Sequence, residues 1–313
     1  MRQRTRCEEE CGLGRSGSGG VTRGKSRFDD IYVQPDPRAY FTRLAPLDYE
    51  IPHHAQPVFR QVAAERAAHG DSRTGGLVVL DLCCSYGINA ALLNHEVTLA
   101  ELYERYTSDT ASRMSPEELA AWDRDFYAER RRPDALRVYG LDIATPAVRY
   151  ARDAGLLEAG FTDDLERVPP GPELRRALPE VGLITLTGGG SYITERTFTA
   201  LLDGVRGHVW VSAFVLRTVS YEPVVRRLAA YGLRTTVETS RTYPQRRFTD
   251  EREQQYAIQA VRALGGDPSG REEAGRFHSV LYDSRPGGAV HAPVTGGHQP
   301  DHLAGADGST YRD

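Results

Sequence analysis

The sequence is almost devoid of lysine. Lys25 is the only lysine among the 39 lysine and arginine residues, and all the others are arginine. We attribute this bias to codon usage in a GC-rich genome and not to a phosphate-binding device. The net charge is −4 at pH 7. A basic excess of the kind that nucleic acids attract is therefore missing, and we expect no nucleic-acid partner.

Cysteines and long apolar runs are also scarce. The chain has 4 cysteines in 313 residues. Cys7 and Cys11 lie in a tail rich in Gly and Ser, and Cys83 and Cys84 are adjacent, so a reducing compartment is indicated. No apolar run approaches the length of a membrane span, and no apolar secretory segment follows the first arginines. We therefore expect a cytoplasmic protein without a membrane partner.

A dinucleotide fingerprint and sequence-adjacent metal ligands are missing as well. The stretch 77–93 reads LVVLDLCCSYGINAALL: an apolar run with an acid at Asp81, then small residues, then an Ala-rich helix start. A buried strand that turns tightly into a helix is the ligand-binding unit of open α/β sheets. A dinucleotide site would show G-x-G-x-x-G after the strand. Its absence argues against an NAD-dependent oxidoreductase, and we expect no metal.

Acidic residues follow the next two predicted strands. The segment 136–142 reads as a strand that ends in Asp142. A carboxylate at this place can accept hydrogen bonds from both hydroxyls of a ribose. Ile143 follows and could pack on an adenine ring. After a short third strand come Asp163 and Asp164, of which we prefer Asp164 as the acceptor for an adenine amino group.

Glycines follow the fourth predicted strand. The segment 181–186 is apolar and leads into Thr187 and three consecutive glycines that begin at Gly188. Glycines at the exit of a strand indicate a close approach of the backbone to a ligand or to another segment. The edge formed by these strand ends is therefore the predicted binding site.

The order of these motifs resembles that of class I S-adenosylmethionine-dependent methyltransferases. Their first motif is an acid followed by three alternating glycines, and the matching positions here are Asp81, Cys83, Ser85 and Gly87. Cysteine and serine tolerate a positive φ poorly, so we expect this turn to differ in detail. The runs GGGSYITERTF and QRRF are also similar to those of a bacterial subgroup of small-molecule methyltransferases.

The resemblance implies a fold and a cofactor. The fold is α/β, with a doubly wound, seven-stranded, mostly parallel sheet of the Rossmann-like methyltransferase type and helical insertions. S-adenosylmethionine would lie across the crevice between the first and fourth strands. The implied cofactor-binding residues are Asp81, Cys83, Ser85, Tyr86 and Gly87 for the methionine part, Asp142 for the ribose, Ile143 and Asp164 for the adenine, and Thr187 and Gly188 at the edge of strand four.

Shifts in composition predict how the chain is organised. The predicted parts are disordered tails at 1–27 and 286–313, an N-terminal cap with a lead-in helix at 28–70, and a cofactor-binding α/β domain at 71–285 with a helical insertion at 95–134 and a cap insertion at 239–277. The first insertion leaves a helix, so we expect it at the sheet edge opposite the crevice, as scaffold or oligomer contact. The second should begin over the pocket. Val21 is a candidate translation start, since GC-rich bacterial genes often begin at a valine codon.

Transfer of an activated methyl group needs little from the protein. In-line displacement requires placement of the nucleophile, and an oxygen or nitrogen nucleophile can also need a base. The candidate catalytic residues are His53, His54 and Tyr192, and the candidate substrate-binding residues are Tyr49, Arg217, Arg246 and Arg247. The arginines could hold a substrate carboxylate. For each of these residues a purely structural role is the common alternative.

We therefore predict a methyltransferase that acts on a small-molecule acceptor. Two alternatives stay open. One is an enzyme that cyclises the aminobutyl part of S-adenosylmethionine and releases methylthioadenosine. The other is a degenerate cofactor-binding scaffold, because two of the three loop glycines are replaced. The oligomeric state and the identity of the acceptor do not follow from the sequence.

Overall fold

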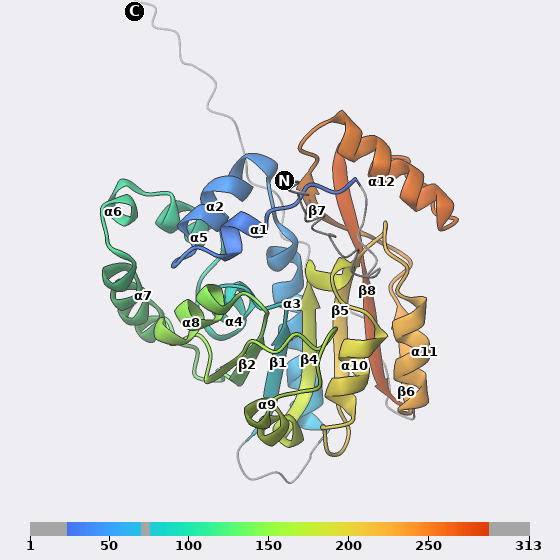
Figure 1. Ribbon diagram of the computed structural model, residues 1–313, viewed down its shortest axis with the longest axis horizontal. Helices are drawn as coiled ribbons and strands as arrows, with labels where there is room; N and C mark the ends of the chain where they lie inside the picture. The colour runs from blue at the N-terminus through green and yellow to red at the C-terminus, as the bar shows by residue number, and fades with distance from the viewer. Residues whose placement is uncertain (1–23, 70–75, 288–313) are drawn as a thin grey trace, which may run out of the picture.

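The computed structural model describes residues 24–69 and 76–287. Its strands form one eight-stranded sheet in the order β3-β2-β1-β4-β5-β8-β6, with β7 paired to β8 (Figure 1). The strands are β1 (Val78–Leu82), β2 (Arg137–Leu141), β3 (Ala159–Phe161), β4 (Val181–Thr187), β5 (Trp210–Leu216), β6 (Leu233–Val237), β7 (Tyr243–Arg247) and β8 (Arg276–Pro286).

The central strands are apolar because both faces of the sheet are covered. Every residue of β1, β4 and β5 is buried, as is usual for parallel strands with helices on both sides. β1 lies between β2 and β4 and is parallel to both. The chain runs outward from β1 to β3 on one side and from β4 to β5 on the other. The strand order therefore reverses between β1 and β4, where open α/β sheets bind their ligands.

Helices cover the two faces of the sheet as separate layers. The helices are α1 (Asp29–Tyr32), α2 (Arg38–Leu44), α3 (Ile51–Ala68), α4 (Ile88–Asn94), α5 (Leu99–Tyr106), α6 (Asp109–Ser112), α7 (Pro116–Glu129), α8 (Thr145–Asp153), α9 (Pro172–Ala177), α10 (Glu195–Leu202), α11 (Glu222–Ala230) and α12 (Glu251–Ala263), with 3-10 turns η1 (Ala45–Leu47), η2 (Leu178–Glu180) and η3 (Gly189–Ser191). Residues of α2 to α5, α7 and α8 form one apolar core with one face of the sheet. Residues of α9 to α11 form a second core on the other face.

The predicted doubly wound, mostly parallel sheet is confirmed, with one strand more than the seven predicted. The expected antiparallel edge consists of β8, which pairs with β5 and β6. The additional strand is β7, which comes from the predicted cap insertion and pairs with the beginning of β8. β8 has 11 residues and is longer than the predicted strand at 278–283. Its first residues extend beyond β6, and β7 satisfies their backbone groups.

The N-terminal segment packs over the carboxyl end of the sheet. The hydroxyl of Tyr86, in the turn after β1, donates to the carbonyl oxygens of Ile31 at 2.7 Å and Gln34 at 2.9 Å. α3 begins at Ile51 and contains Pro57 in its interior. In Figure 1 the helices α1 and α2 lie at the same end of the sheet as α12.

The first insertion supports this cap. Ser115 and Glu118 form a capping box at the start of α7. The hydroxyl of Tyr103 in α5 donates to the backbone oxygen of Tyr49 at 2.9 Å. Asp123 of α7 is fully buried and accepts hydrogen bonds from side chains of α5 and α8. The insertion therefore positions the cap as well as extending the scaffold.

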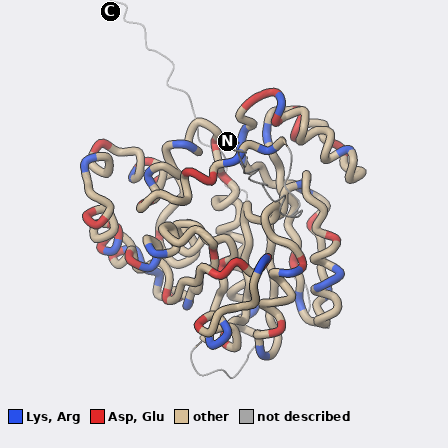
Figure 2. Tube along the Cα trace, in the orientation of Figure 1, with Lys and Arg blue, Asp and Glu red and all other residues tan. Residues whose placement is uncertain are grey.

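Within residues 24–69 and 76–287, no helix combines the length and the apolar content needed to span a membrane. Basic and acidic residues are mixed along α7, α11 and α12 (Figure 2). Of the two predicted tails, the structure describes residues 24–27 and 286–287. The other residues of both tails, among them the candidate start at Val21, lie outside the described residues.

Candidate functional site

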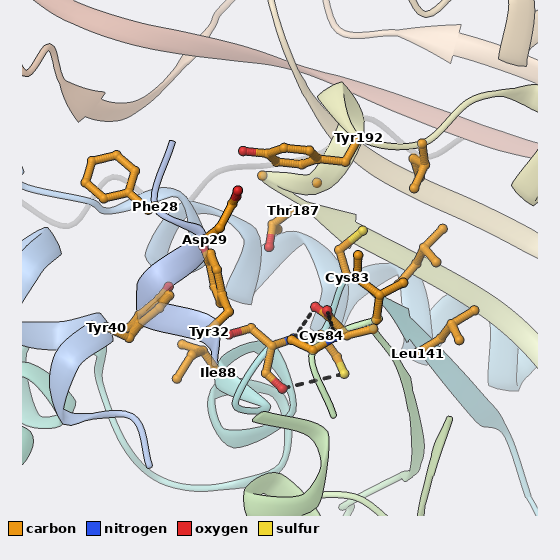
Figure 3. Close-up of a pocket in the computed structure, with 18 of the residues that line it drawn as sticks. Phe28, Asp29, Tyr32, Tyr40, Cys83, Cys84, Ile88, Leu141, Thr187 and Tyr192 are labelled. Atoms are coloured by element: carbon orange, nitrogen blue, oxygen red, sulfur yellow. Dashed lines mark hydrogen bonds between the residues drawn. The ribbon is translucent and has the colours of Figure 1, made fainter. Parts of the chain in front are cut away.

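A cavity of about 490 Å³ opens at the carboxyl ends of β1, β2 and β4. Its floor consists of the turn after β1 and the strand ends, and its roof consists of residues of α1 and α2 with Tyr49 and Pro52 (Figure 3). β7 closes one side with Gln245 and Arg246. The position matches the switch point of the sheet, and the volume is in the range of small-molecule sites.

The turn after β1 has the backbone conformation of a glycine-rich loop. Cys83 has φ 59°, Ser85 has φ 51° and Gly87 has φ 77°. The cysteine and the serine thus adopt a positive φ in spite of their Cβ atoms. The backbone N–H of Ser85 donates to Asp142 Oδ2 at 2.9 Å, and that of Cys83 donates to the carbonyl oxygen of Leu141 at 2.8 Å. Hydrogen bonds to β2 thus hold the strained residues in place.

Glycine at position 83 should relieve part of this strain. A left-handed conformation costs an L-residue with a Cβ atom about 1 kcal/mol or more relative to glycine. We expect Cys83→Gly to have a free energy of unfolding about 1 kcal/mol above that of Cys83→Ala, which loses the same thiol but keeps Cβ. Urea unfolding of both variants measures the difference. Equal stability of the two variants would show that the turn carries no such strain.

Asp81 lies beneath the cavity and not in its wall. Its side chain is 1% exposed, and Oδ1 accepts hydrogen bonds from Asn89 Nδ2 and Thr185 Oγ1, both at 3.0 Å. Burial raises the pKa of Asp81 to about 7, although both hydrogen bonds oppose the shift. Asn89 also donates to Thr187 Oγ1 at 2.9 Å and lines the cavity. Asp81 therefore positions Asn89, which in turn contacts Thr187. The sequence predicted Asp81 itself at the methionine part of the cofactor, whereas its side chain does not line the cavity.

Asp142 joins the end of β2 to the turn. Its Oδ2 accepts from the backbone N–H of Ser85 and its Oδ1 from that of Ala144, both at 2.9 Å. Burial raises the pKa of Asp142, and the two hydrogen bonds oppose this shift. A carboxylate can accept about four hydrogen bonds, so each oxygen retains capacity on the cavity side. Ile143 beside it is 67% exposed and also lines the cavity.

Both acids after β3 line the cavity, and their hydrogen bonds distinguish them. Asp163 Oδ1 accepts from the backbone N–H of Gly171. Asp164 Oδ1 accepts from the backbone N–H of Glu166 at 3.2 Å, and Oδ2 lies 3.3 Å from Arg167 Nε. The side chain of Asp164 is 33% exposed. The structure thus places the preferred residue, Asp164, in the wall without excluding its neighbour.

Neighbouring side chains lie so close to the backbone after β4 that only glycine fits there without a shift. Gly188 has φ +70°, and a Cβ atom there would lie 2.7 Å from the hydroxyl of Tyr49. A Cβ atom on Gly189 would lie 2.4 Å from the thiol of Cys83. Thr187 and both glycines line the cavity. Side chains larger than hydrogen at 188 and 189 would therefore displace the roof or the floor of the site.

Tyrosines from the N-terminal segment form the roof. Tyr32, Tyr40 and Tyr49 line the cavity, and Tyr40 contacts both other rings edge to face, with centroids 6.1 Å and 6.0 Å away. Burial raises the pKa of all three phenols, so they are neutral at physiological pH. The part of the roof that these three residues form is therefore aromatic and uncharged.

Of the three candidate catalytic residues, one lines the cavity and two do not. Tyr192 lines the cavity, and Figure 3 shows its ring reaching over the site toward Phe28 and Asp29. Its side chain is 55% exposed, and burial of the rest raises its pKa. His53 and His54 are not in the cavity wall. The pKa of His54 is lowered to about 4 by burial and by its neighbour His53, and its ring packs near that of Tyr243.

Of the candidate substrate-binding residues, Tyr49 and Arg246 line the cavity and two arginines do not. Arg217 pairs with Glu272 and donates to the carbonyl oxygen of Asp267. Arg247 pairs with Asp48. These partners compensate both guanidinium charges outside the site.

Two predicted residues of the turn face the protein and not the cavity. Tyr86 contacts the cap through its hydroxyl, as described above, and Gly87 faces Ala151 and Leu156, which a Cβ atom would approach to 3.1 Å and 3.2 Å.

Sequence reasoning missed several wall residues: Lys25, Phe28, Tyr32, Tyr40, Asn89 and Gln245. The only signal in the sequence for any of these residues is that Lys25 is the one lysine of the chain. In the part of the chain that the structure describes, no group of three or more His, Cys, Asp or Glu side chains is placed to hold a metal ion.

Some solved structures are similar to this chain at low sequence identity. No family model and no curated protein matches the chain. Among solved structures, magnesium protoporphyrin IX methyltransferase from Synechocystis PCC 6803 with bound SAM is 16% identical over 75% of this chain and 80% of that chain, with a TM-score of 0.36. YcgJ from Bacillus subtilis is 10% identical over 75% and 98%, with a TM-score of 0.40. The [4+2]-cyclase SpnF is 12% identical over 74% and 80%, with a TM-score of 0.36. These values are too low for any activity to be transferred to this chain.

Proposed function

We propose that this chain is a class I S-adenosylmethionine-dependent methyltransferase that acts on a small molecule. The observation that carries the proposal is the junction of Asp142 with the positive-φ turn at the switch point. There a carboxylate with free acceptor capacity faces a 490 Å³ cavity. This is the arrangement that would hold a ribose against a tightly turned loop.

The wall fits a cationic nucleoside. S-adenosylmethionine carries a positive sulfonium, which carboxylates and aromatic faces stabilise. Acidic residues and tyrosines share the wall: Asp29, Asp142, Asp163, Asp164, Glu166, Tyr32, Tyr40 and Tyr49. Ser85 also lines the cavity, and its buried Oγ has no hydrogen-bond partner among the described residues. Buried hydroxyls rarely lack a partner, so this atom is available to a bound ligand.

The residues of the chain would bind, orient and exclude water. Asp142 would hold the ribose, Ile143 and Asp164 the adenine, and the turn with Thr187 and Gly188 the methionine part. When bound, the cofactor supplies a methyl group that is already activated for displacement. The cap covers the site and orders the acceptor, which is the main requirement of such a transfer. Tyr192 is the only candidate catalytic residue in the wall. Its raised pKa suits hydrogen-bond donation to the acceptor and not proton removal near pH 7.

Product analysis tests the proposal. The purified chain should bind S-adenosylmethionine in calorimetry. With metabolite extracts and methyl-labelled cofactor it should form S-adenosylhomocysteine and a labelled small molecule. With the cofactor alone it should release no methylthioadenosine. Methylthioadenosine formed without an acceptor would instead identify the cyclising enzyme, and absence of cofactor binding would identify a degenerate scaffold whose replaced loop glycines no longer support the site.

A further inference from the structure

Lys25, the one lysine of the chain, lies in the cavity wall. Ser26, the residue after it, is bound to the segment at the start of α12. The backbone N–H of Ser26 donates to Glu253 Oε1 at 2.7 Å, and the hydroxyl of Ser26 lies 2.6 Å from that of Thr249. These contacts attach the strap, residues 24–28, to the start of α12. The side chain of Lys25 is thereby held at the cavity.

The other cations of the wall already have carboxylate partners. Arg27 pairs with Asp29 at 2.5 Å. Arg246 binds Glu253 through two hydrogen bonds of 2.6 Å and 2.8 Å. Such bidentate pairs compensate the guanidinium charge in place.

Glu253 has no acceptor capacity left for Lys25. Its two oxygens accept from the backbone N–H groups of Ser26 and Thr249, the Thr249 hydroxyl and both terminal nitrogens of Arg246. These five donors exceed the roughly four acceptor sites of a carboxylate. Among the described residues, Lys25 has one hydrogen-bonding contact, with Ser191 Oγ at 3.4 Å, and no carboxylate within ion-pair distance.

The surroundings of Lys25 are aromatic. Its Nζ lies 5.3 Å from the centroid of the Tyr192 ring, and that ring is 55% exposed. Phe28 lines the same side of the cavity. Burial, reinforced by the charge of Arg246 and opposed by that of Glu253, lowers the pKa of Lys25 to about 8. The amine is therefore mostly protonated near pH 7, and a bound anion would restore the missing counter-charge.

We propose that the acceptor is a small aromatic carboxylate whose anionic group binds Lys25 Nζ and whose ring packs on Tyr192. This inference rests on the proposed function, because it concerns the molecule that receives the methyl group. It assigns the wall formed by the strap, η3 and β7 to the acceptor. The wall formed by the turn, Asp142 and Asp164 remains for the cofactor.

Benzoate and its neutral isostere benzamide test the proposal by NMR titration of the full chain, with and without S-adenosylhomocysteine. Benzoate should bind at least about tenfold more tightly than benzamide, as expected for a charged hydrogen bond. Lys25→Met should weaken benzoate binding about tenfold or more, while Lys25→Arg should keep it within about threefold. The matched control is Arg43→Met, which removes one cation from an exposed position of α2 and should change nothing.

The pH dependence and the cofactor affinity provide independent readouts. The charged or titratable groups that face Lys25 are Arg246 of β7, Glu253 of α12 and Tyr192 beside η3. Benzoate affinity should fall above about pH 8 in the wild type, where Lys25 loses its proton, and should stay constant in Lys25→Arg. Equal binding of benzoate and benzamide would overturn the proposal. So would a loss of S-adenosylhomocysteine affinity in Lys25→Met with benzoate binding unchanged. Failure of S-adenosylhomocysteine to bind the wild type would instead count against the proposed function, since the benzoate titration does not need it.

Discussion

Replacing Asp142 by alanine is expected to weaken the binding of S-adenosylmethionine by at least about 100-fold, since hydrogen bonds to a charged acceptor contribute about 1.5–3 kcal/mol each. The proposed hydrogen bonds from the two ribose hydroxyls to Asp142 would be lost together. The backbone N–H groups of Ser85 and Ala144 would also lose their acceptor, so the turn itself would relax. Isothermal titration calorimetry of wild type and variant measures the change.

A matched pair of ligands separates ribose recognition from a general loosening of the turn. The wild type should prefer adenosine to 2′,3′-dideoxyadenosine, and Asp142→Ala should lose this preference. Asp164→Asn is the comparison variant. Its side chain is one-third exposed and already paired with Arg167, so its effect should be about tenfold or less. If Asp142→Ala kept the preference for the hydroxyls, the ribose would have to bind elsewhere.

Asp81→Asn is expected to stabilise the folded protein strongly at pH 8 and hardly at pH 4. The pKa of Asp81 is raised from 3.8 to about 7 by burial. A raised pKa of a carboxyl means that the folded state prefers the protonated form. The wild type therefore loses stability as the pH rises from about 4 to about 7, and asparagine does not titrate. A shift of this size corresponds to about 4 kcal/mol in the free energy of unfolding.

Asparagine can reproduce the contacts of the protonated acid. The two shorter contacts of Asp81, from Asn89 and Thr185 at 3.0 Å, both use Oδ1, and only a longer contact of 3.4 Å from Asn89 reaches Oδ2. Urea unfolding at pH 4 and pH 8 gives the difference between the two proteins at each pH. Glu104→Gln removes an exposed carboxylate from α5 and controls for the loss of one negative charge. An equal effect of Asp81→Asn at both pH values would mean that Asp81 is not desolvated as the structure indicates.

The centre of the sheet was predictable from the sequence because β1, β4 and β5 are mainly apolar runs. The cavity floor was predictable as well, because Asp142, Ile143 and Thr187 are adjacent to strand ends in the sequence as well as in space. The extra strand β7 was not predictable, since its residues, YPQRR, contain no alternating apolar pattern. It becomes a strand because the beginning of β8 lacks another partner.

The cavity roof depends on contacts between segments far apart in the chain. Ser26 and Glu253 are 227 residues apart, and no local sequence pattern predicts the hydrogen bond between them. The same applies to the arginines. Arg246 and Arg247 are neighbours in the sequence, but one pairs with Glu253 inside and the other with Asp48 outside. Tyr86 looked like a ligand contact because of its motif position, whereas its hydroxyl attaches the cap.

The scarcity of lysine has a practical consequence. Apart from the α-amino group, an amine-directed reagent finds a single side chain in this protein, and that side chain is in the cavity wall. Acylation by an N-hydroxysuccinimide ester would thus modify one internal position. Ligands could be ranked by how far they protect that position from the reagent, without knowledge of any reaction product.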